Sequence, residues 1–342
     1  MSDDLETLKL QAQDYCSKIP TMIVGSGASS SFGLSGMGAL ADHLQREVNP
    51  CDDDKDTWVE ICTLLQRGTD LESALLQKDL TADLRRQVVD ATWNLLNPQD
   101  IKAFQQSLKE KGYFPLGKFL QHCLRTNENT LQVITTNYDR LIEYACEQEN
   151  IHWFTGFGHG YRKFQVNEDV LRANKVAKKI VNIWKVHGSL DWYDIAGQVV
   201  SLSNSEIIQQ DCTPYIVTPG KDKYQQTHDE PYRSIITAAD VAMKSASSYL
   251  CVGFGFNDKH IQPKLIERCT INNTPIVILA RTLTDATKKF LFESKPKNFI
   301  AIELNEISRG SSIYSSKRAT PSEPLVVSDD LWSLNGFLSI II

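Results

Sequence analysis

The sequence of 342 residues predicts an α/β protein with a doubly wound, mainly parallel, Rossmann-like sheet and a helical insertion. Short apolar runs typical of buried strands alternate along the chain with stretches of helical periodicity, which favours parallel strands joined by helical crossovers. Between the first two of these runs lies a long stretch with helical periodicity and no clear strand pattern. This stretch predicts the helical insertion over about residues 53–128.

In the first half of the chain, apolar runs that enter turns predict strands, and leucines at helical spacings predict helices. Pro98 and Pro115 interrupt the helical stretch and predict breaks in it. The predicted order is a strand (20–25), a helix (38–48), an acidic loop (49–56), several helices (58–125), a strand (131–135), a polar turn (136–139) and a helix (140–148).

The second half repeats the alternation, and its clearest strands are apolar runs rich in Val, Ile and Leu. The C-terminal part is polar and rich in serine, which indicates a loop followed by a helix or strand. Residues 1–304 are therefore predicted to form one domain, with residues 305–342 as a polar loop and a C-terminal element. The predicted order is strands (181–187, 215–218 and 249–254), a helix (258–269), a strand (275–280), a helix (282–292), a strand (299–304), a loop (305–323) and a terminal helix or strand (331–342).

Composition narrows the class of protein. The net charge of -6 disfavours an extended basic surface, so no direct binding of nucleic acid is expected. No apolar run approaches the ~18 residues of a membrane span. The acidic N-terminal segment lacks the basic start and apolar stretch of a secretory signal. We therefore expect a cytoplasmic protein without a membrane segment.

The eight cysteines are scattered, and none forms a Cys-x-x-Cys pair. Zinc sites of the usual spacing use such pairs, so no zinc and no other metal site is expected. With no secretory signal, the thiols are expected to stay reduced and to pack as small apolar groups.

Four polar or glycine-rich segments follow predicted strands. In a parallel sheet the carboxyl ends of the strands gather the ligand-binding loops, so these segments are expected to meet. The glycines of the first and last segments permit close approach of backbone amides to a phosphate. The candidate binding residues are Gly25, Ser26, Gly27, Ala28, Ser29, Thr136, Asn137, Asp139, His187, Gly253, Phe254, Gly255 and Asn257.

Each segment also has a purely structural interpretation. The first can be an ordinary strand-to-helix turn. Asn137 and Asp139 can orient a water or a ribose hydroxyl, or cap a helix. His187 can act as a general base near neutral pH, or serve only the fold. Residues 253–258 can hold an adenosine or ribose, or cap the next helix through Asn257 or Asp258.

Taken together, the four segments resemble the NAD-binding core of the sirtuin family, in the family's order. That family binds NAD with a Gly-Ala-Gly-x-Ser loop, contacts ribose and nicotinamide with a Thr-x-Asn-x-Asp turn, takes its base from a His-Gly and holds adenosine with a later glycine-rich loop. Residues 25–29, 136–139, 187–188 and 253–257 are similar to these motifs. The resemblance implies NAD as substrate.

Two departures from the sirtuin deacylases are informative. The two zinc-binding Cys-x-x-Cys pairs are absent, and residues 32–36 read Phe-Gly-Leu-Ser-Gly where those enzymes have Asp-Phe-Arg. This pattern resembles the bacterial sirtuin-like group of antiphage defence proteins. That resemblance implies NAD hydrolysis, assembly into a homo-oligomer, and control by oligomerisation or by a complex with an ATPase or another defence protein.

The predicted activity is cleavage of NAD to nicotinamide and ADP-ribose, with Asn137 and His187 as catalytic residues. Cleavage develops oxocarbenium character at the anomeric carbon. Asn137 would position the water, His187 would activate it or a ribose hydroxyl, and Asp139 would hold the ribose. Three alternatives stay open: a sirtuin-type deacylase or ADP-ribosyltransferase, a non-catalytic subunit that senses NAD or ADP-ribose, and a scaffold.

Overall fold

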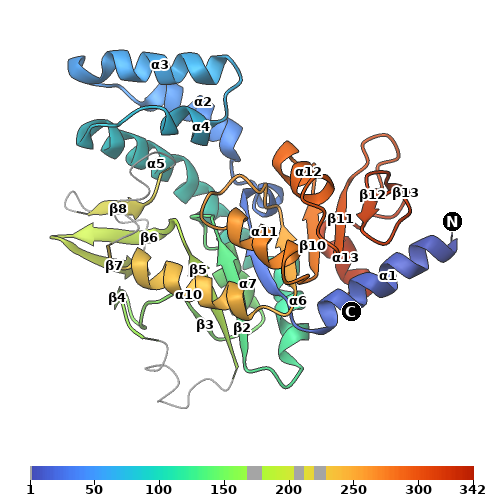
Figure 1. The fold of residues 1–342 in the computed structure, drawn as a ribbon. Helices are drawn as coiled ribbons and strands as arrows, with labels where there is room; N and C mark the ends of the chain where they lie inside the picture. The colour runs from blue at the N-terminus through green and yellow to red at the C-terminus, as the bar shows by residue number, and fades with distance from the viewer. Residues whose placement is uncertain (1, 168–178, 204–211, 219–228) are drawn as a thin grey trace.

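The computed structural model describes residues 2–167, 179–203, 212–218 and 229–342, and shows an α/β fold built on one large sheet and one small sheet (Figure 1). The large sheet has nine strands in the order β13-β12-β11-β10-β9-β1-β2-β5-β3. All neighbouring pairs are parallel except β11–β12 and β12–β13. The predicted mixed α/β fold with a large, mainly parallel sheet is therefore confirmed.

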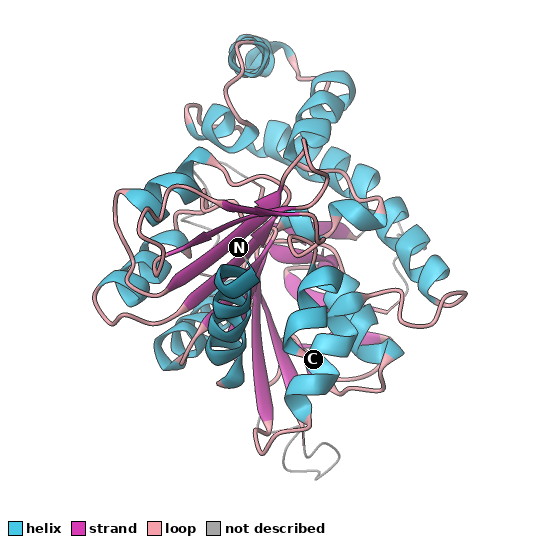
Figure 2. Ribbon diagram, turned by 90° about the vertical axis from the view of Figure 1, so that its right-hand side faces the viewer, coloured by secondary structure: helices cyan, strands magenta, loops and turns pink. Residues whose placement is uncertain are grey.

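The strands of the large sheet are short, and its central strands are almost wholly buried, as expected when helices cover both faces of a parallel sheet. Figure 2 shows these helices on both sides. The strands are β1 (Thr21–Val24), β2 (Thr130–Thr135), β3 (Trp153–Phe154), β5 (Ile180–Lys185), β9 (Tyr249–Val252), β10 (Ile276–Ala280), β11 (Phe299–Leu304), β12 (Ser311–Ser315) and β13 (Leu325–Val327).

The chain winds in two directions from β1. It first passes to β2 and β5 on one side, then crosses to β9 on the other side and continues through β10 and β11. Loops that diverge at such a reversal leave a crevice at the carboxyl ends of the strands, where ligands of open α/β sheets bind. The reversal lies between β1 and β9, which pair in parallel along their whole length.

A separate apolar cluster lies on each face of the large sheet. Ile23 packs with the cluster that contains residues of α10, α11 and α12, whereas its neighbours Met22 and Val24 pack with residues of α1, α6, α7 and α13. The helices are α1 (Ser2–Ser17), α2 (Met37–Glu47), α3 (Lys55–Gln66), α4 (Leu71–Leu76), α5 (Ala82–Ser107), α6 (Pro115–Leu124), α7 (Leu141–Gln148), α10 (Tyr232–Ser245), α11 (Gln262–Thr270), α12 (Asp285–Phe292) and α13 (Leu334–Ile341).

The segment between β1 and β2 contains helices and no strand. α2 to α5 project from the sheet (Figure 1) and bury a separate apolar cluster that includes Leu44, Ile61 and Leu84. α5 runs through Pro98, where the sequence predicts a break. Burial of Leu96, Asp100 and other residues on both sides of the proline outweighs the lost backbone hydrogen bond.

The small antiparallel sheet has the order β4-β7-β6-β8, and its strand β6 begins directly after His187. The sequence predicts only β8 of these strands. Residues 162–164 and 188–202 mix polar and apolar positions and lack the apolar run that predicts the strands of the large sheet. The strands are β4 (Arg162–Phe164), β6 (Gly188–Ile195), β7 (Gln198–Leu202) and β8 (Thr213–Ile216).

The C-terminal region differs from its predicted loop. β12 lies within residues 305–323 and is buried against β11. Its serines satisfy their hydroxyls internally: Ser311 Oγ donates to the Asp329 carbonyl at 2.7 Å, and Ser315 Oγ donates to Gln11 Oε1 at 2.8 Å. A serine-rich strand can therefore be buried, although its composition resembles that of a loop. Among the helices of the described residues, none has the length and apolar character needed to cross a bilayer.

Candidate functional site

A cavity of about 420 Å³ lies at the carboxyl ends of the central strands. It brings together all four segments singled out in the sequence, at the crevice expected from the topology. Of the predicted residues only Ala28 does not line it; Ala28 faces a second cavity of about 610 Å³ behind the loop. The predicted residues that line the first cavity are Gly25, Ser26, Gly27, Ser29, Thr136, Asn137, Asp139, His187, Gly253, Phe254, Gly255 and Asn257.

The two glycine-rich segments pack directly against each other. The Gly25 amide donates to the Val252 carbonyl at 3.0 Å, and the Gly27 amide donates to the Gly253 carbonyl at 3.1 Å. A Cβ on Gly253, whose φ is +62°, would lie 2.1 Å from the Ala28 nitrogen, and one on Gly27 would lie 2.9 Å from the Gly253 Cα. The glycines thus serve loop-to-loop packing, a different reason from the close approach to a ligand expected from the sequence.

Asn137 lies in the turn after β2, buried at the wall of the cavity. Its Nδ2 donates to the Gly25 carbonyl and to Ser29 Oγ, each at 3.0 Å. Ser29 Oγ in turn donates its hydrogen to Asp139 Oδ2 at 2.7 Å. Because Ser29 needs its own hydrogen for the carboxylate, the Asn137 atom facing it must be the amide nitrogen. Both amide hydrogens are therefore used, and Oδ1 is left as an acceptor.

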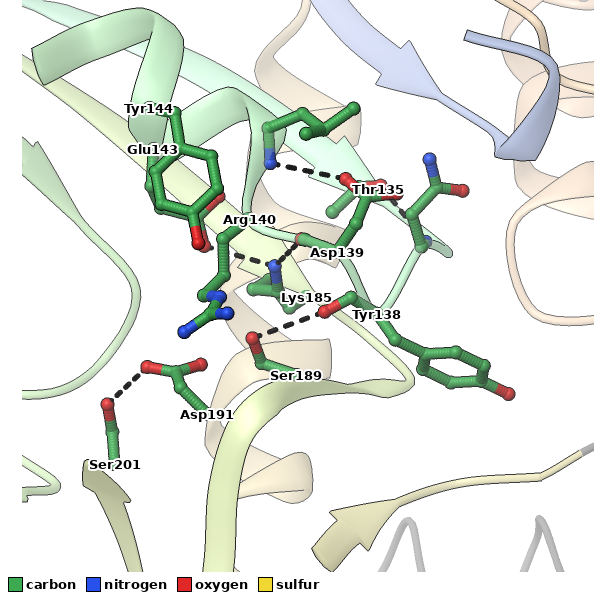
Figure 3. A network of polar contacts seen from close by, with 12 residues as sticks. Thr135, Tyr138, Asp139, Arg140, Glu143, Tyr144, Lys185, Ser189, Asp191 and Ser201 are labelled. Carbon is green, nitrogen blue, oxygen red and sulfur yellow. Dashed lines mark hydrogen bonds and ion pairs between the residues drawn. The ribbon is translucent and has the colours of Figure 1, made fainter. Parts of the chain in front are cut away.

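Asp139 is buried between the cavity and a set of charged residues behind it. Burial raises the pKa of its carboxyl, while the nearby Lys185 and the Ser29 hydrogen bond act in the opposite direction. The Lys185 Nζ, fully buried, donates to the Asp139 carbonyl and lies 3.0 Å from Glu143 Oε1 (Figure 3). Burial likewise raises the pKa of Glu143, opposed by Lys185. The buried ammonium thus fixes the backbone of the turn that carries Asn137 and Asp139.

A buried ion pair ties this turn to the helical segment. Arg140 Nη2 lies 2.5 Å from Asp100 Oδ2, and the Arg140 amide donates to Asp100 Oδ1 at 2.7 Å. Tyr144 Oη donates to the same carboxylate at 2.7 Å. The sequence shows no signal for this pairing, since Asp100 lies in α5, 40 positions before Arg140.

His187 follows β5 and lies at the cavity with only 9% of its surface exposed. Its Nε2 lies 3.0 Å from Asp258 Oδ2, within the distance of an ion pair, although Nε2 makes no hydrogen bond with a described residue. Asp258 Oδ1 accepts from the His260 and Ile261 amides, each at 2.9 Å. Asp258 thus holds the turn before α11, although Ile261 and not Asp258 is the N-cap of that helix. Its position beside His187 is not revealed by the sequence.

The helical segment contributes side chains that the sequence does not assign to the site. Residues of α2, α4 and α5 reach over the carboxyl edge of the sheet and line the same cavity. These residues are Met37, Leu40, Asp70, Leu71, Glu72 and Leu96. The spacing of leucines predicts that these helices exist, but not which part of the sheet they cover.

The candidate metal ligands of the described residues lie outside the cavity. Among the described residues, one group of three has ligand atoms within 4.8 Å of one another: Cys51, Asp54 and Asp83. None of the three lines the cavity. In this group Asp54 Oδ2 already accepts from the Cys51 thiol at 3.3 Å and from the Thr81 hydroxyl at 2.6 Å. All eight cysteines are free. The expectation of no zinc stays a prediction.

Comparisons with solved structures give distant similarity. A structure of a Sir2 enzyme, described for mechanism and regulation, is 14% identical, with 84% of this chain and 90% of that chain covered and a TM-score of 0.44. Sir2Tm bound to a propionylated peptide is 14% identical, with 82% and 87% covered and a TM-score of 0.41. A sirtuin structure described for substrate affinity is 14% identical, with 82% and 88% covered and a TM-score of 0.39.

A comparison with curated proteins gave no match. Residues 131–282 match the family model described as a SIR2-like domain. That range includes the turn after β2, His187 and the glycine-rich segment after β9, and it excludes the first glycine-rich loop. Over residues 131–282 the chain is similar to the SIR2-like domain family.

Proposed function

We propose that this protein binds NAD and hydrolyses its nicotinamide–ribose bond, releasing nicotinamide and ADP-ribose. The observation that carries the proposal is the pairing, in one cavity, of an asparagine with a single free acceptor atom and a histidine beside a carboxylate. The similarity of residues 131–282 to the SIR2-like domain family supports NAD as the substrate.

In the proposed reaction, Asn137 Oδ1 accepts a hydrogen from the attacking water or from a ribose hydroxyl. Because Nδ2 is held by Gly25 and Ser29, the amide cannot turn, and the acceptor stays in place. Fixing the nucleophile before the reaction lowers the entropic cost of reaching the transition state.

His187 acts as the general base in this proposal. The water oxygen bonds to the anomeric carbon, the carbon–nitrogen bond breaks, and its electron pair neutralises the pyridinium, so nicotinamide leaves without acid help. The water proton passes to His187, and the Asp258 carboxylate at 3.0 Å stabilises the imidazolium that forms.

The test is nicotinamide release from NAD by the purified chain, measured by chromatography. We expect Asn137→Ala and His187→Ala each to lower turnover by about 10²–10⁴-fold, the usual cost of losing a positioned acid–base group. NAD affinity and melting temperature should change much less. His159→Ala is the matched control, because His159 is exposed and does not line the cavity. Wild-type turnover in both cavity variants would contradict the assignment.

A parallel reaction with an acyl-lysine peptide separates hydrolysis from the sirtuin-type alternative. A hydrolase releases nicotinamide at the same rate with and without peptide and leaves the acyl group in place. Nicotinamide release that depends on the peptide would favour a deacylase. Binding of NAD without release under either condition would favour the sensor.

The proposed biological role is antiphage defence by NAD depletion in the cytoplasm. It rests on the resemblance of the four motifs to the defence group and on the missing Cys-x-x-Cys pairs. Because an uncontrolled NADase would drain the cell, the proposal includes control through a homo-oligomer or a partner such as an ATPase. Cells expressing the chain should lose NAD only after infection, and the His187→Ala variant should keep its NAD.

A further inference from the structure

The charge of the cavity is strongly one-sided. Its described lining residues include four carboxylates, Asp70, Glu72, Asp139 and Asp258. Arg281 is the one lysine or arginine among the same lining residues. An anionic group entering this cavity would meet repulsion from the carboxylates unless it lay beside Arg281.

The carboxylates have structural roles in the fold, which three of them show directly. Asp70 caps α4 by accepting from the Ser73 amide at 2.9 Å. Asp139 accepts from Ser29, and Asp258 accepts from the His260 and Ile261 amides just before α11. The conformations of these acids therefore follow from the fold.

Arg281 differs from them because its guanidinium makes no hydrogen bond or ion pair with a described residue. It follows β10 directly, and its backbone carbonyl accepts from the Leu304 amide. The acid on the neighbouring strand, Glu303, is used by the Leu283 amide at 2.7 Å and the Tyr314 hydroxyl at 2.8 Å. The side chain of Arg281 is exposed and available to a ligand.

The position of Arg281 is fixed relative to both glycine-rich segments. Thr284 Oγ1 donates to the Gly255 carbonyl at 2.6 Å, which joins the loop after β10 to the segment after β9. Arg281 also lines the second cavity, behind residues 25–29. A planar guanidinium at this junction can reach phosphate oxygens on the ligand with two parallel hydrogen bonds.

We infer that Arg281 binds a phosphate group of the dinucleotide and supplies the positive charge that the rest of the cavity lacks. The inference rests on the proposed function, because it requires NAD or its product in this cavity. The phosphate is either the diphosphate, present in NAD and ADP-ribose, or a 2′-phosphate, present in NADP.

The experiment is calorimetric titration of the full chain with NAD, NADP, ADP-ribose and adenosine, for the wild type, Arg281→Ala and Arg281→Lys. Lys289→Ala is the matched control: Lys289 is exposed on α12 and lines neither cavity. Melting temperatures verify that each variant is folded. A lost charge-assisted contact should weaken binding by about 10- to 100-fold.

Weaker binding of both NAD and ADP-ribose by Arg281→Ala, with adenosine unchanged, supports contact with the diphosphate. Weaker binding of NADP alone supports contact with a 2′-phosphate. Arg281→Lys should lose less affinity than Arg281→Ala, and Lys289→Ala should bind as the wild type does. Wild-type affinity for NAD, ADP-ribose and NADP in folded Arg281→Ala overturns the inference alone. A wild-type chain that binds none of the ligands overturns the proposed function, and the inference with it.

Discussion

At the scale of single residues, the cavity is organised by side chains that combine a structural bond with a free atom. Asn137 uses both amide hydrogens on the fold and keeps Oδ1. Asp258 uses Oδ1 to accept from two backbone amides in the turn before α11 and presents Oδ2 to His187. In each side chain, hydrogen bonds to the fold fix the position of the group, and another atom of the same group stays accessible to a ligand or a catalytic neighbour.

The Asp258→Asn variant tests the roles of the two carboxylate oxygens separately. The amide oxygen can still accept from the His260 and Ile261 amides, so the turn before α11 and the melting temperature should be kept. The charge beside His187 is lost, so we expect kcat for nicotinamide release to fall about 10-fold or more while KM stays nearly constant. A purely structural role predicts the reverse, a lower melting temperature with normal kcat in the folded protein.

Asp139 predicts a pH dependence of stability. Burial raises its pKa above the ordinary value of 3.8, so the folded protein holds this proton more tightly than the unfolded chain. Stability is therefore lost as the pH rises from 3.8 through the raised pKa. Asp139→Asn lacks this titration, so the free energy of unfolding of the wild type minus that of the variant should fall with rising pH. Urea denaturation at a series of pH values measures it, and a difference that grows with pH contradicts it.

At the scale of elements, the contact between the two glycine-rich segments fixes the floor of the cavity. The sequence singles out both segments, because glycines after apolar runs are visible without a structure. It could not reveal that the two segments touch, since residues 25–27 and 253 come together only through the pairing of β1 with β9.

Gly253→Ala tests this contact. The new Cβ would meet the Ala28 nitrogen at 2.1 Å, so we expect a loss of about 3 kcal/mol or more in the free energy of unfolding. Gly197→Ala is the control, because Gly197 has a φ of +80° with no atom within 4 Å of the added Cβ. It should cost only about 1–2 kcal/mol for the left-handed conformation. Equal losses in urea denaturation would show that the loop contact is soft.

Elements with an unbroken apolar run were predictable, and elements with mixed composition were not. β1, β2, β5, β9, β10 and β11 all lie within a residue or two of their predicted ranges. The sequence misses β3, β4, β6, β7, β12, β13, α1 and α10, which are short or of mixed composition. Some of their polar residues have partners far away in the chain. Ser315, bonded to Gln11, is one example.

At the scale of the whole molecule, the winding of the sheet assembles the cavity from residues between 25 and 284. The alternation of strands and helices was enough to predict which edge of the sheet carries it. The sequence could not place α2, α4 and α5 over that edge, because the direction of a helical segment depends on packing between distant surfaces. The contributions of Asp70 and Glu72 were missed for the same reason. Arg281 was missed although it directly follows a predicted strand, because no motif marks it.

The cysteines predict a chain without zinc and with slow thiol chemistry. Burial raises the pKa of both Cys16 and Cys123 to about 12, and the thiolate is the form that reacts and binds metal. We expect these two thiols, with the buried Cys146, Cys251 and Cys269, to react with a thiol reagent only after denaturation, when all eight should titrate. Stoichiometric zinc in the purified protein, or fewer than eight thiols after denaturation, would contradict this.

The described edges of both sheets are short. The large sheet ends on β13 and β3, of three and two residues, and the small sheet on β4 and β8, of three and four. A strand of that length offers few unpaired backbone groups to a neighbouring molecule, so it is a poor template for adding a strand from another copy. If copies of this chain assemble, as one form of the proposed control requires, these edges direct the contact away from strand pairing and toward side chains on the helical surfaces.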